Sequence, residues 1–249
     1  MTTSYACSKK IIRDLDCNLR DQMYKLLAAN FHNVDWLRFC NDLESKDFVF
    51  LMRDLSGNLA GFSTQKLLHT DAGDLVVFSG DTIIDPAAWG SLEFPKTWGL
   101  WMLSIQKSNP KLPLYWLLIS KGQRTYRYLS TFFIDFAPKW DRTYSAEEIK
   151  IIKEIGAGLF GGDLVRDEKG YLFVKAGPES QYLKEHLLDY KINSTKKTAV
   201  DFFESVNPNY YKGSELVCFL QFSPHNMRPF CRRMLGLNPN ATGDHAHVD

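Results

Sequence analysis

Three cations are crowded at the start of a predicted helix, and their spacing suits the binding of an anion. Lys121, Arg124 and Arg127 stand at or just before the first turns of a segment with helical apolar spacing, Gln123 to Phe133. Cations at a helix N-terminus oppose the helix dipole and cost roughly 0.3–1 kcal/mol each. Two explanations are open: Lys121 and Arg124 bind a phosphate, or the three side chains form a solvated basic face that salt screens.

Histidines and cysteines give weaker signals. His69 ends a predicted strand and is interpreted either as a base or as a structural residue. His245 and His247, with two aspartates nearby, have the composition of a metal site only, so we expect no metal. The five cysteines show no Cys-x-x-Cys spacing, which is typical of reduced thiols in a cytosolic protein.

A strand–turn–helix unit precedes the cationic helix. Leu75 to Ile84 is rich in β-branched and aromatic residues and predicts a buried strand. Gly80 at its midpoint indicates a bulge or a close backbone approach. Asp85 and Pro86 end the strand, and a helix is predicted over Ser91–Asn109. The free N–H groups at the start of such a helix can hold an anion.

A second unit of the same kind follows. Leu114 to Ile119 predicts a short apolar strand, Ser120-Lys121-Gly122 a turn, and Gln123 to Phe133 the next helix. Two helices and a hairpin are predicted before the first unit, with the hairpin turn at Ser56-Gly57-Asn58.

This order of elements and two motifs resemble the GNAT superfamily of N-acetyltransferases. The family's phosphate loop reads Val-x-Pro-x-x-Arg-Gly-x-Gly-x-Gly, and Ile84 to Phe94 keeps its hydrophobic position, its proline and one glycine, Gly90. The family's second signature is Asn-x-x-Ala, then Tyr, then Gly-Phe. It aligns from Lys121, with Arg124 at the alanine and Tyr128 at the tyrosine.

The resemblance predicts an α/β protein (an α+β mixed sheet) with a GNAT-like acyl-CoA N-acyltransferase fold, splayed at its central strand, and a C-terminal extension. It implies that the Ile84 N–H faces the acyl carbonyl and that Tyr128 is the general acid. Asp81 is interpreted either as the base or as a carboxylate that hydrogen-bonds the backbone at the Gly80 bulge. Tyr128 is alternatively an ordinary packing residue.

The donor-binding residues expected from the resemblance are Ile84, Trp89, Gly90, Ser91, Lys121 and Arg124. In the phosphate loop, Trp89 replaces the basic residue, while Leu92 and Phe94 replace glycines. A Cβ at those positions restricts φ and crowds a diphosphate. Either the donor is held differently, with Lys121 and Arg124 on the phosphate of a pantetheine-type donor, or the acyltransferase chemistry is lost.

The composition is that of an ordinary globular protein. The 249 residues carry a net charge near +1, so we expect no nucleic-acid partner. There is no apolar run of membrane-spanning length, and we expect a cytoplasmic protein. Residues 1–140 are predicted to form the GNAT-like core. Residues 141–237 are predicted to add a helix, capped by Ser145 and Glu148, and closing strands on the same sheet, and residues 238–249 a disordered tail.

The predicted function is acyl transfer from a thioester donor, acyl-CoA or an acylated carrier protein, to a small-molecule amine or related acceptor, with no tightly bound cofactor. The alternative is a catalytically inactive GNAT-like module that binds a ligand or a protein. The two differ in whether the cleft between the Leu75 and Leu114 strands is open or is plugged by Trp89, Leu92 and Phe94. Some aromatic residues suit a long acyl chain as well as core packing: Trp98, Trp101, Phe132 and Phe133. The oligomeric state is not predicted.

Overall fold

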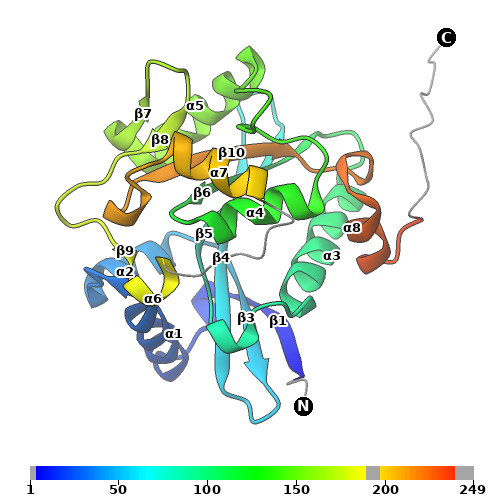
Figure 1. The fold of residues 1–249 in the computed structure, drawn as a ribbon. Coiled ribbons are helices and arrows are strands. Elements are labelled where there is room, and N and C mark those ends of the chain that lie inside the picture. Colours follow the sequence, from blue (N-terminus) through cyan, green and yellow to red (C-terminus); the bar gives the residue numbers. More distant parts are fainter. Residues whose placement is uncertain (1–3, 189–196, 239–249) are drawn as a thin grey trace.

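A computed structural model of the chain describes residues 4–188 and 197–238 (Figure 1). Its main feature is a sheet of eight strands. Among the described strands of this sheet, β5 and β6 pair in parallel, and the other pairings are antiparallel. The predicted mixed α/β class is therefore confirmed. In sheet order the strands are β1 (Tyr5–Ile11), β3 (Phe48–Asp54), β4 (Leu59–His69), β5 (Leu75–Ile84), β6 (Leu114–Ser120), β10 (Glu215–Gln221), β8 (Leu172–Val174) and β7 (Leu164–Arg166).

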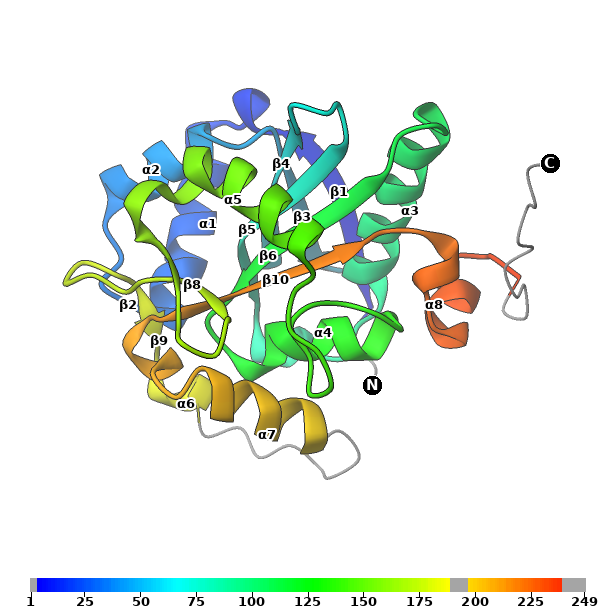
Figure 2. The same ribbon diagram turned by 90° about the horizontal axis from the view of Figure 1, so that it is seen from above.

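Helices cover both faces of the sheet, as Figure 2 shows for α4 and α7 on one side of β6 and β10 and α5 on the other. One apolar cluster joins the first face to α3, α4, α7 and α8, and two others join the second face to α1, α2 and α5. The helices are α1 (Cys17–Asn30), α2 (Trp36–Glu44), α3 (Glu93–Ser108), α4 (Gln123–Phe132), α5 (Ala146–Phe160), α6 (Glu185–Leu188), α7 (Lys197–Val206) and α8 (Pro229–Met234).

Helix starts follow the capping residues of the sequence. Asp16 accepts a hydrogen bond from the Leu19 backbone N–H (2.7 Å) and so caps α1. Ser145 and Glu148 form the predicted capping box of α5. None of the described helices is both long and apolar enough to cross a membrane.

Two C-terminal elements differ from the sequence prediction. Helix α7 was not predicted, because its first residues were interpreted as part of a polar stretch; Ala199 and Phe203, one turn apart, are its buried anchors. The sequence also predicts a short helix around Tyr182–Leu188, and the structure confirms only its second half, α6. Its first two residues form the short strand β9 (Tyr182–Leu183), which pairs with β2 (Phe31–His32). The predicted disordered tail, with His245 and His247, lies outside the described residues from position 239 onward.

The sheet opens between β5 and β6. Their parallel ladder runs from Leu75 opposite Leu114 to Ser79 opposite Leu118. Beyond Ser79, β5 stays paired with β4, whereas β6 stays paired with β10, so the two strands diverge. Side chains, not backbone ladder, therefore line the gap between them.

A bulge in β5 lies at the point of divergence. Gln65 pairs with Ser79 and Ser63 with Thr82, so Gly80 and Asp81 together oppose Thr64. This register shift confirms the predicted bulge. A Cβ on Gly80 would lie 2.7 Å from the Thr64 hydroxyl, so a larger residue would require that side chain to move. The extra residue reverses the alternation of side chains, so Asp81 shares the α1–α2 face with Ile83.

Candidate active site

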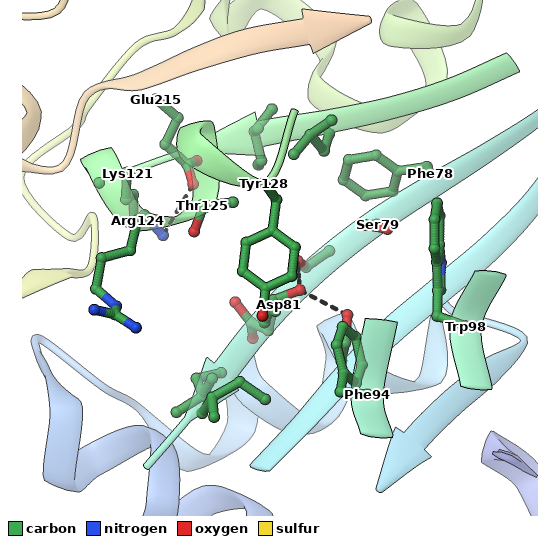
Figure 3. A pocket seen from close by; sticks show the side chains of 18 of the residues that line it. Phe78, Ser79, Asp81, Phe94, Trp98, Lys121, Arg124, Thr125, Tyr128 and Glu215 are labelled. Carbon is green, nitrogen blue, oxygen red and sulfur yellow. Dashed lines mark hydrogen bonds and ion pairs between the residues drawn. The ribbon is translucent and has the colours of Figure 1, made fainter. Parts of the chain in front are cut away.

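A cavity of about 550 Å³ occupies the gap between β5 and β6 and is lined from both faces of the sheet. On the face of α1 and α2 its wall is a set of charged residues, called here the charged side: Asp42, Lys46, Asp81, Lys121 and Glu215. On the face of α3 and α4 its wall is a set of aromatic residues, called here the aromatic side: Trp98, Trp116, Phe132, Phe133 and Phe222. Figure 3 shows Tyr128 extending from α4 into the cavity, with Asp81 on the strand that crosses it.

Two ion pairs organise the charged side. The Lys121 ammonium lies 3.2 Å from Glu215, and the Lys46 ammonium lies 2.6 Å from Asp42. The Lys46 side chain is 4 % exposed, so its charge has little access to solvent. With Asp81, three carboxyl groups face two ammonium groups, and full ionisation leaves one excess negative charge. Such a surface favours a cationic ligand such as an ammonium.

Asp81 has a strongly raised pKa within this cluster. Burial, followed by the negative charge of Asp42, raises the pKa of its carboxyl to about 6, while Lys121 and Lys46 oppose the rise. A carboxylate with a pKa near 6 is ionised at neutral pH and is a stronger base than an ordinary aspartate. Asp81 can therefore exchange a proton with a ligand near neutral pH.

Lys121 lies on the charged side, and its principal contact is Glu215. Burial lowers the pKa of Lys121, but Glu215 and Asp81 outweigh this effect and raise it. Lys121 therefore stays protonated, and its ammonium also lies 5.6 Å from the centre of the Phe31 ring. Arg124 lies apart from it and stacks on Trp89, with 3.3 Å between the guanidinium carbon and the ring centre. The two cations predicted to share a phosphate thus contact different groups.

Tyr128 lines the cavity from the face opposite to Asp81. Burial raises the pKa of its hydroxyl, and Arg124 opposes this in part. The hydroxyl therefore keeps its proton at neutral pH and can donate it.

Ile84 directs backbone groups toward the gap. The Asp85 N–H donates to the Ala60 carbonyl across β4 (2.8 Å). By the alternation of a strand, the N–H and C=O of Ile84 must then point away from β4, toward the gap. The Ile84 carbonyl accepts a hydrogen bond from the indole N–H of Trp89 (2.8 Å).

The turn between β5 and α3 leaves the cavity open. Trp89, Gly90, Ser91 and Phe94 line it, but Leu92 is 41 % exposed and does not. Gly90 has φ +94°, a left-handed conformation that glycine adopts without strain. The outcome expected for a plugged cleft is therefore not observed.

Several residues of the site were missed by sequence reasoning. Glu215, Asp42 and Lys46 meet Asp81 only through the fold, although the spacing of Asp42 and Lys46, one helical turn apart, is a recognisable ion-pair signal. Gln123, at the start of α4, also lines the cavity. Its side-chain oxygen is buried and has no hydrogen-bonding partner among the described residues. Within residues 4–188 and 197–238, no group of three His, Cys, Asp or Glu side chains is placed to hold a metal ion.

Comparison with known proteins finds similarity at the level of structure. Neither a protein-family model nor a curated protein matches the sequence. The ribosomal-protein-alanine N-acetyltransferase of Brucella melitensis is 15 % identical and has a TM-score of 0.41, over 57 % of this chain and 97 % of that one. The S18-alanine enzyme of Escherichia coli is 8 % identical, with a TM-score of 0.41, over 87 % and 94 %. A GNAT family N-acetyltransferase of Escherichia coli, solved with CoA, is 12 % identical with a TM-score of 0.37, over 53 % and 71 %.

The order of elements predicted from the sequence is confirmed by the topology of the chain itself. Two helices, a hairpin, the central strand β5, the crossover helix α3, the parallel strand β6 and α4 follow in the expected order. β10 and β8 then extend the same sheet, as predicted for the closing strands.

Proposed function

We propose that this protein transfers an acyl group from a thioester donor to an amine. The observation that carries the proposal is the open cavity between β5 and β6, which has a carboxyl group with a pKa near 6 on one face and a protonated tyrosine on the other. Aminolysis of a thioester needs a base for the ammonium and an acid for the thiolate. Asp81 and Tyr128 supply one of each, and they are separated by the plane of the sheet.

The chemical step follows from this placement. Asp81 accepts a proton from the acceptor's ammonium, and the amine nitrogen then forms a bond to the acyl carbon. The Ile84 N–H, directed into the gap, donates a hydrogen bond to the carbonyl oxygen as negative charge develops on it. The bond between carbon and sulfur breaks, and Tyr128 gives its proton to the departing thiolate. The nitrogen, now part of the amide, loses its second proton to the Tyr128 phenolate, which restores Tyr128. Solvent removes the proton from Asp81, so that one proton is released for each acyl transfer.

A pantetheine-type donor, free as acyl-CoA or carried by a protein, suits two further features. The unpartnered Gln123 oxygen can accept a hydrogen bond from an amide N–H, and pantetheine carries two amides. The Trp89–Arg124 stack lies at the β5–α3 turn, where a donor's phosphate would pass, and the Arg124 guanidinium keeps its charge there. We propose that Arg124, rather than Lys121, contacts that phosphate.

The second candidate is a catalytically inactive ligand-binding module. Two contacts favour it: the ion pair of Lys121 with Glu215, and the hydrogen bond from the Trp89 indole N–H to the Ile84 carbonyl. Both satisfy polar groups of the cavity within the protein, as contacts that only stabilise the fold would do. In that case the cavity binds a ligand but Asp81 transfers no proton.

The test measures binding and turnover on the same protein. Thermal shift is recorded with acetyl-CoA, longer acyl-CoAs and an acylated carrier protein, and released thiol is measured with a panel of primary amines. Acyltransfer predicts a rise in melting temperature with at least one donor and amine-dependent thiol release. The variant Tyr128→Phe should separate the two measurements. It should keep the rise in melting temperature with donor but release thiol more slowly.

Two other outcomes are informative. A donor that binds without thiol release from any amine would support the inactive module. If no donor shifts the melting temperature and no thiol is released, the acyltransferase proposal is wrong.

A further inference from the structure

The aromatic side is a continuous wall of rings. Trp98 and Trp116 lie 4.4 Å apart between ring centres, Phe222 lies 5.8 Å from Trp98, and Phe133 lies 5.8 Å from Trp116. All four line the cavity and are at most 7 % exposed. These rings line the cavity but leave its volume free. A cavity lined by aromatic side chains favours an apolar ligand.

The polar atoms of this wall are already hydrogen-bonded within the protein. The Trp116 indole N–H donates to the Ser79 hydroxyl (2.9 Å), and the Trp98 indole N–H donates to the Gln65 side-chain oxygen (3.2 Å). Ser79 donates to the same Gln65 oxygen (2.7 Å), and the Gln65 amide donates to Ser63 (2.8 Å). The two indoles therefore present carbon, not donors, to a ligand.

Helix α8 closes the aromatic side with small and flexible apolar side chains. Cys231, Met234 and Leu235 line the cavity there. Burial raises the pKa of the Cys231 thiol to about 12, so this residue is a neutral part of the wall and not a nucleophile. Thioether and thiol groups pack readily against a chain of methylenes.

We propose that the aromatic side binds the acyl chain of the donor, and that this chain is an apolar one longer than acetyl. The inference rests on the acyltransferase function proposed above, and it names the class of donor. A cavity of about 550 Å³ lies within the range of roughly 300–1,000 Å³ in which pockets bury drug-sized ligands. A two-carbon acetyl group would leave the ring faces of the aromatic side without a contact.

The experiment uses N-acetylcysteamine thioesters from acetyl to decanoyl, which lack every phosphate of coenzyme A. Isothermal titration gives Kd for each chain length. Each methylene buried against the aromatic side should lower Kd about fourfold, which corresponds to about 0.8 kcal/mol per CH2, until the end of the cavity is reached. A Kd that does not change with chain length would overturn the proposal.

Variants at the closed end locate the chain. Met234→Trp should stop the decrease of Kd at a shorter chain, whereas Arg233→Trp, on the neighbouring exposed position of α8, should leave it unchanged. Phe132→Leu removes a ring from the wall and should extend the decrease to longer chains, and it serves if Met234→Trp does not fold. The same limiting length in all of these proteins would place the chain elsewhere and contradict the inference.

Turnover separates this inference from the function on which it rests. If binding depends on chain length but no amine causes thiol release, the proposed acyl-chain site is supported and the proposed acyltransferase function is contradicted. If acetyl thioesters react with the same kcat/KM as longer thioesters, the proposed acyltransferase function is supported and the proposed acyl-chain site is contradicted.

Discussion

The charged side and the aromatic side share the strands β5 and β6 but hold opposite kinds of chemistry. On the charged side four ionisable groups are gathered around Asp81, and the two carboxylates among them each form an ion pair with a lysine. On the aromatic side the polar atoms of the two indoles are satisfied within the protein, so carbon faces the cavity. One gap in a sheet can thus offer two different environments, because each face of the sheet contributes its own side chains.

The two sides should also recognise ligands by different interactions. A ligand on the charged side is recognised by its charge, with an affinity that depends on pH and salt. A ligand on the aromatic side is recognised by the area that it buries, with an affinity that depends on its length. Substitutions on each side should therefore change different properties of the protein.

Asp81→Asn should abolish most of the turnover. Removing the base lowers kcat/KM by about 10²–10⁴-fold, the usual contribution of general acid–base catalysis. Donor Kd should be unchanged, because the carboxyl group lies on the other face. Steady-state kinetics and titration calorimetry measure the two effects, and a variant that loses donor binding along with turnover would show that the two sides are not separate.

Lys121→Met should destabilise the fold by about 2–4 kcal/mol, since it leaves the Glu215 carboxylate unpaired in a site where that side chain is only 13 % exposed. Chemical denaturation measures the loss. The double variant Lys121→Met with Glu215→Leu should regain most of it. If the two single losses simply add, the ion pair makes no coupled contribution and the charged side is not organised by it.

Tyr128→Phe should lower kcat by about 10²-fold, at the lower end of general-acid effects because a thiolate is a good leaving group. The loss should shrink with a thioester of a more acidic thiol, while the loss in Asp81→Asn persists. Comparison of alkyl and aryl thioesters checks this. An equal loss with both donors would assign Tyr128 to packing.

Asp81 should make the stability of the protein depend on pH. Its pKa in the folded protein, about 6, is above the ordinary value near 4, so the folded state binds this proton more tightly than the unfolded state does. The stabilisation is complete below pH 4 and is lost as pH rises through 6. Relative to wild type, Asp81→Asn should therefore gain roughly 2–3 kcal/mol between pH 4 and pH 8, since each pKa unit corresponds to about 1.4 kcal/mol. Urea unfolding across this range tests the sign, and a constant difference would contradict it.

Arg124→Gln should have the smallest effect. It removes the stack on Trp89, worth about 0.5–1 kcal/mol at a partly exposed site. It should also weaken binding of acyl-CoA more than binding of the matching N-acetylcysteamine thioester, because only the former carries phosphate. Equal weakening of both ligands would remove Arg124 from the proposed phosphate contact.

The sequence was most informative where local patterns decide the structure. Strand β5 has the predicted bounds, and β6 and α4 differ from prediction by one residue, because apolar runs bounded by proline and glycine are strong local signals. Helix α7 was missed because Ala199 and Phe203 are its main buried anchors and a polar stretch precedes them. The pairing of β2 with β9 involves two residues on each strand, which is too short for a hydrophobic periodicity that would predict a strand.

The site was predictable only in part, for the same reason. Asp81, Tyr128 and Ile84 line the cavity as the motifs suggested, but their roles remain predictions. Lys121 was predicted as a phosphate ligand, and its contact with Glu215 depends on the pairing of β6 with β10, which no local pattern reveals. Gln123 resembles any polar residue at a helix start, and its buried oxygen is visible only in the fold.

The bulge at Gly80 has a consequence for the order in which substrates bind. The bulge turns Asp81 to one face while Ser79 belongs to the other. In the reaction proposed above, an acceptor at Asp81 and a donor on the aromatic side would therefore enter the gap from opposite faces. Cys231, the cysteine among the described residues that line the cavity, is held neutral and cannot carry the acyl group between two half-reactions. The proposed reaction should therefore run through a ternary complex with random order, and double-reciprocal plots at several acceptor concentrations should intersect instead of running parallel.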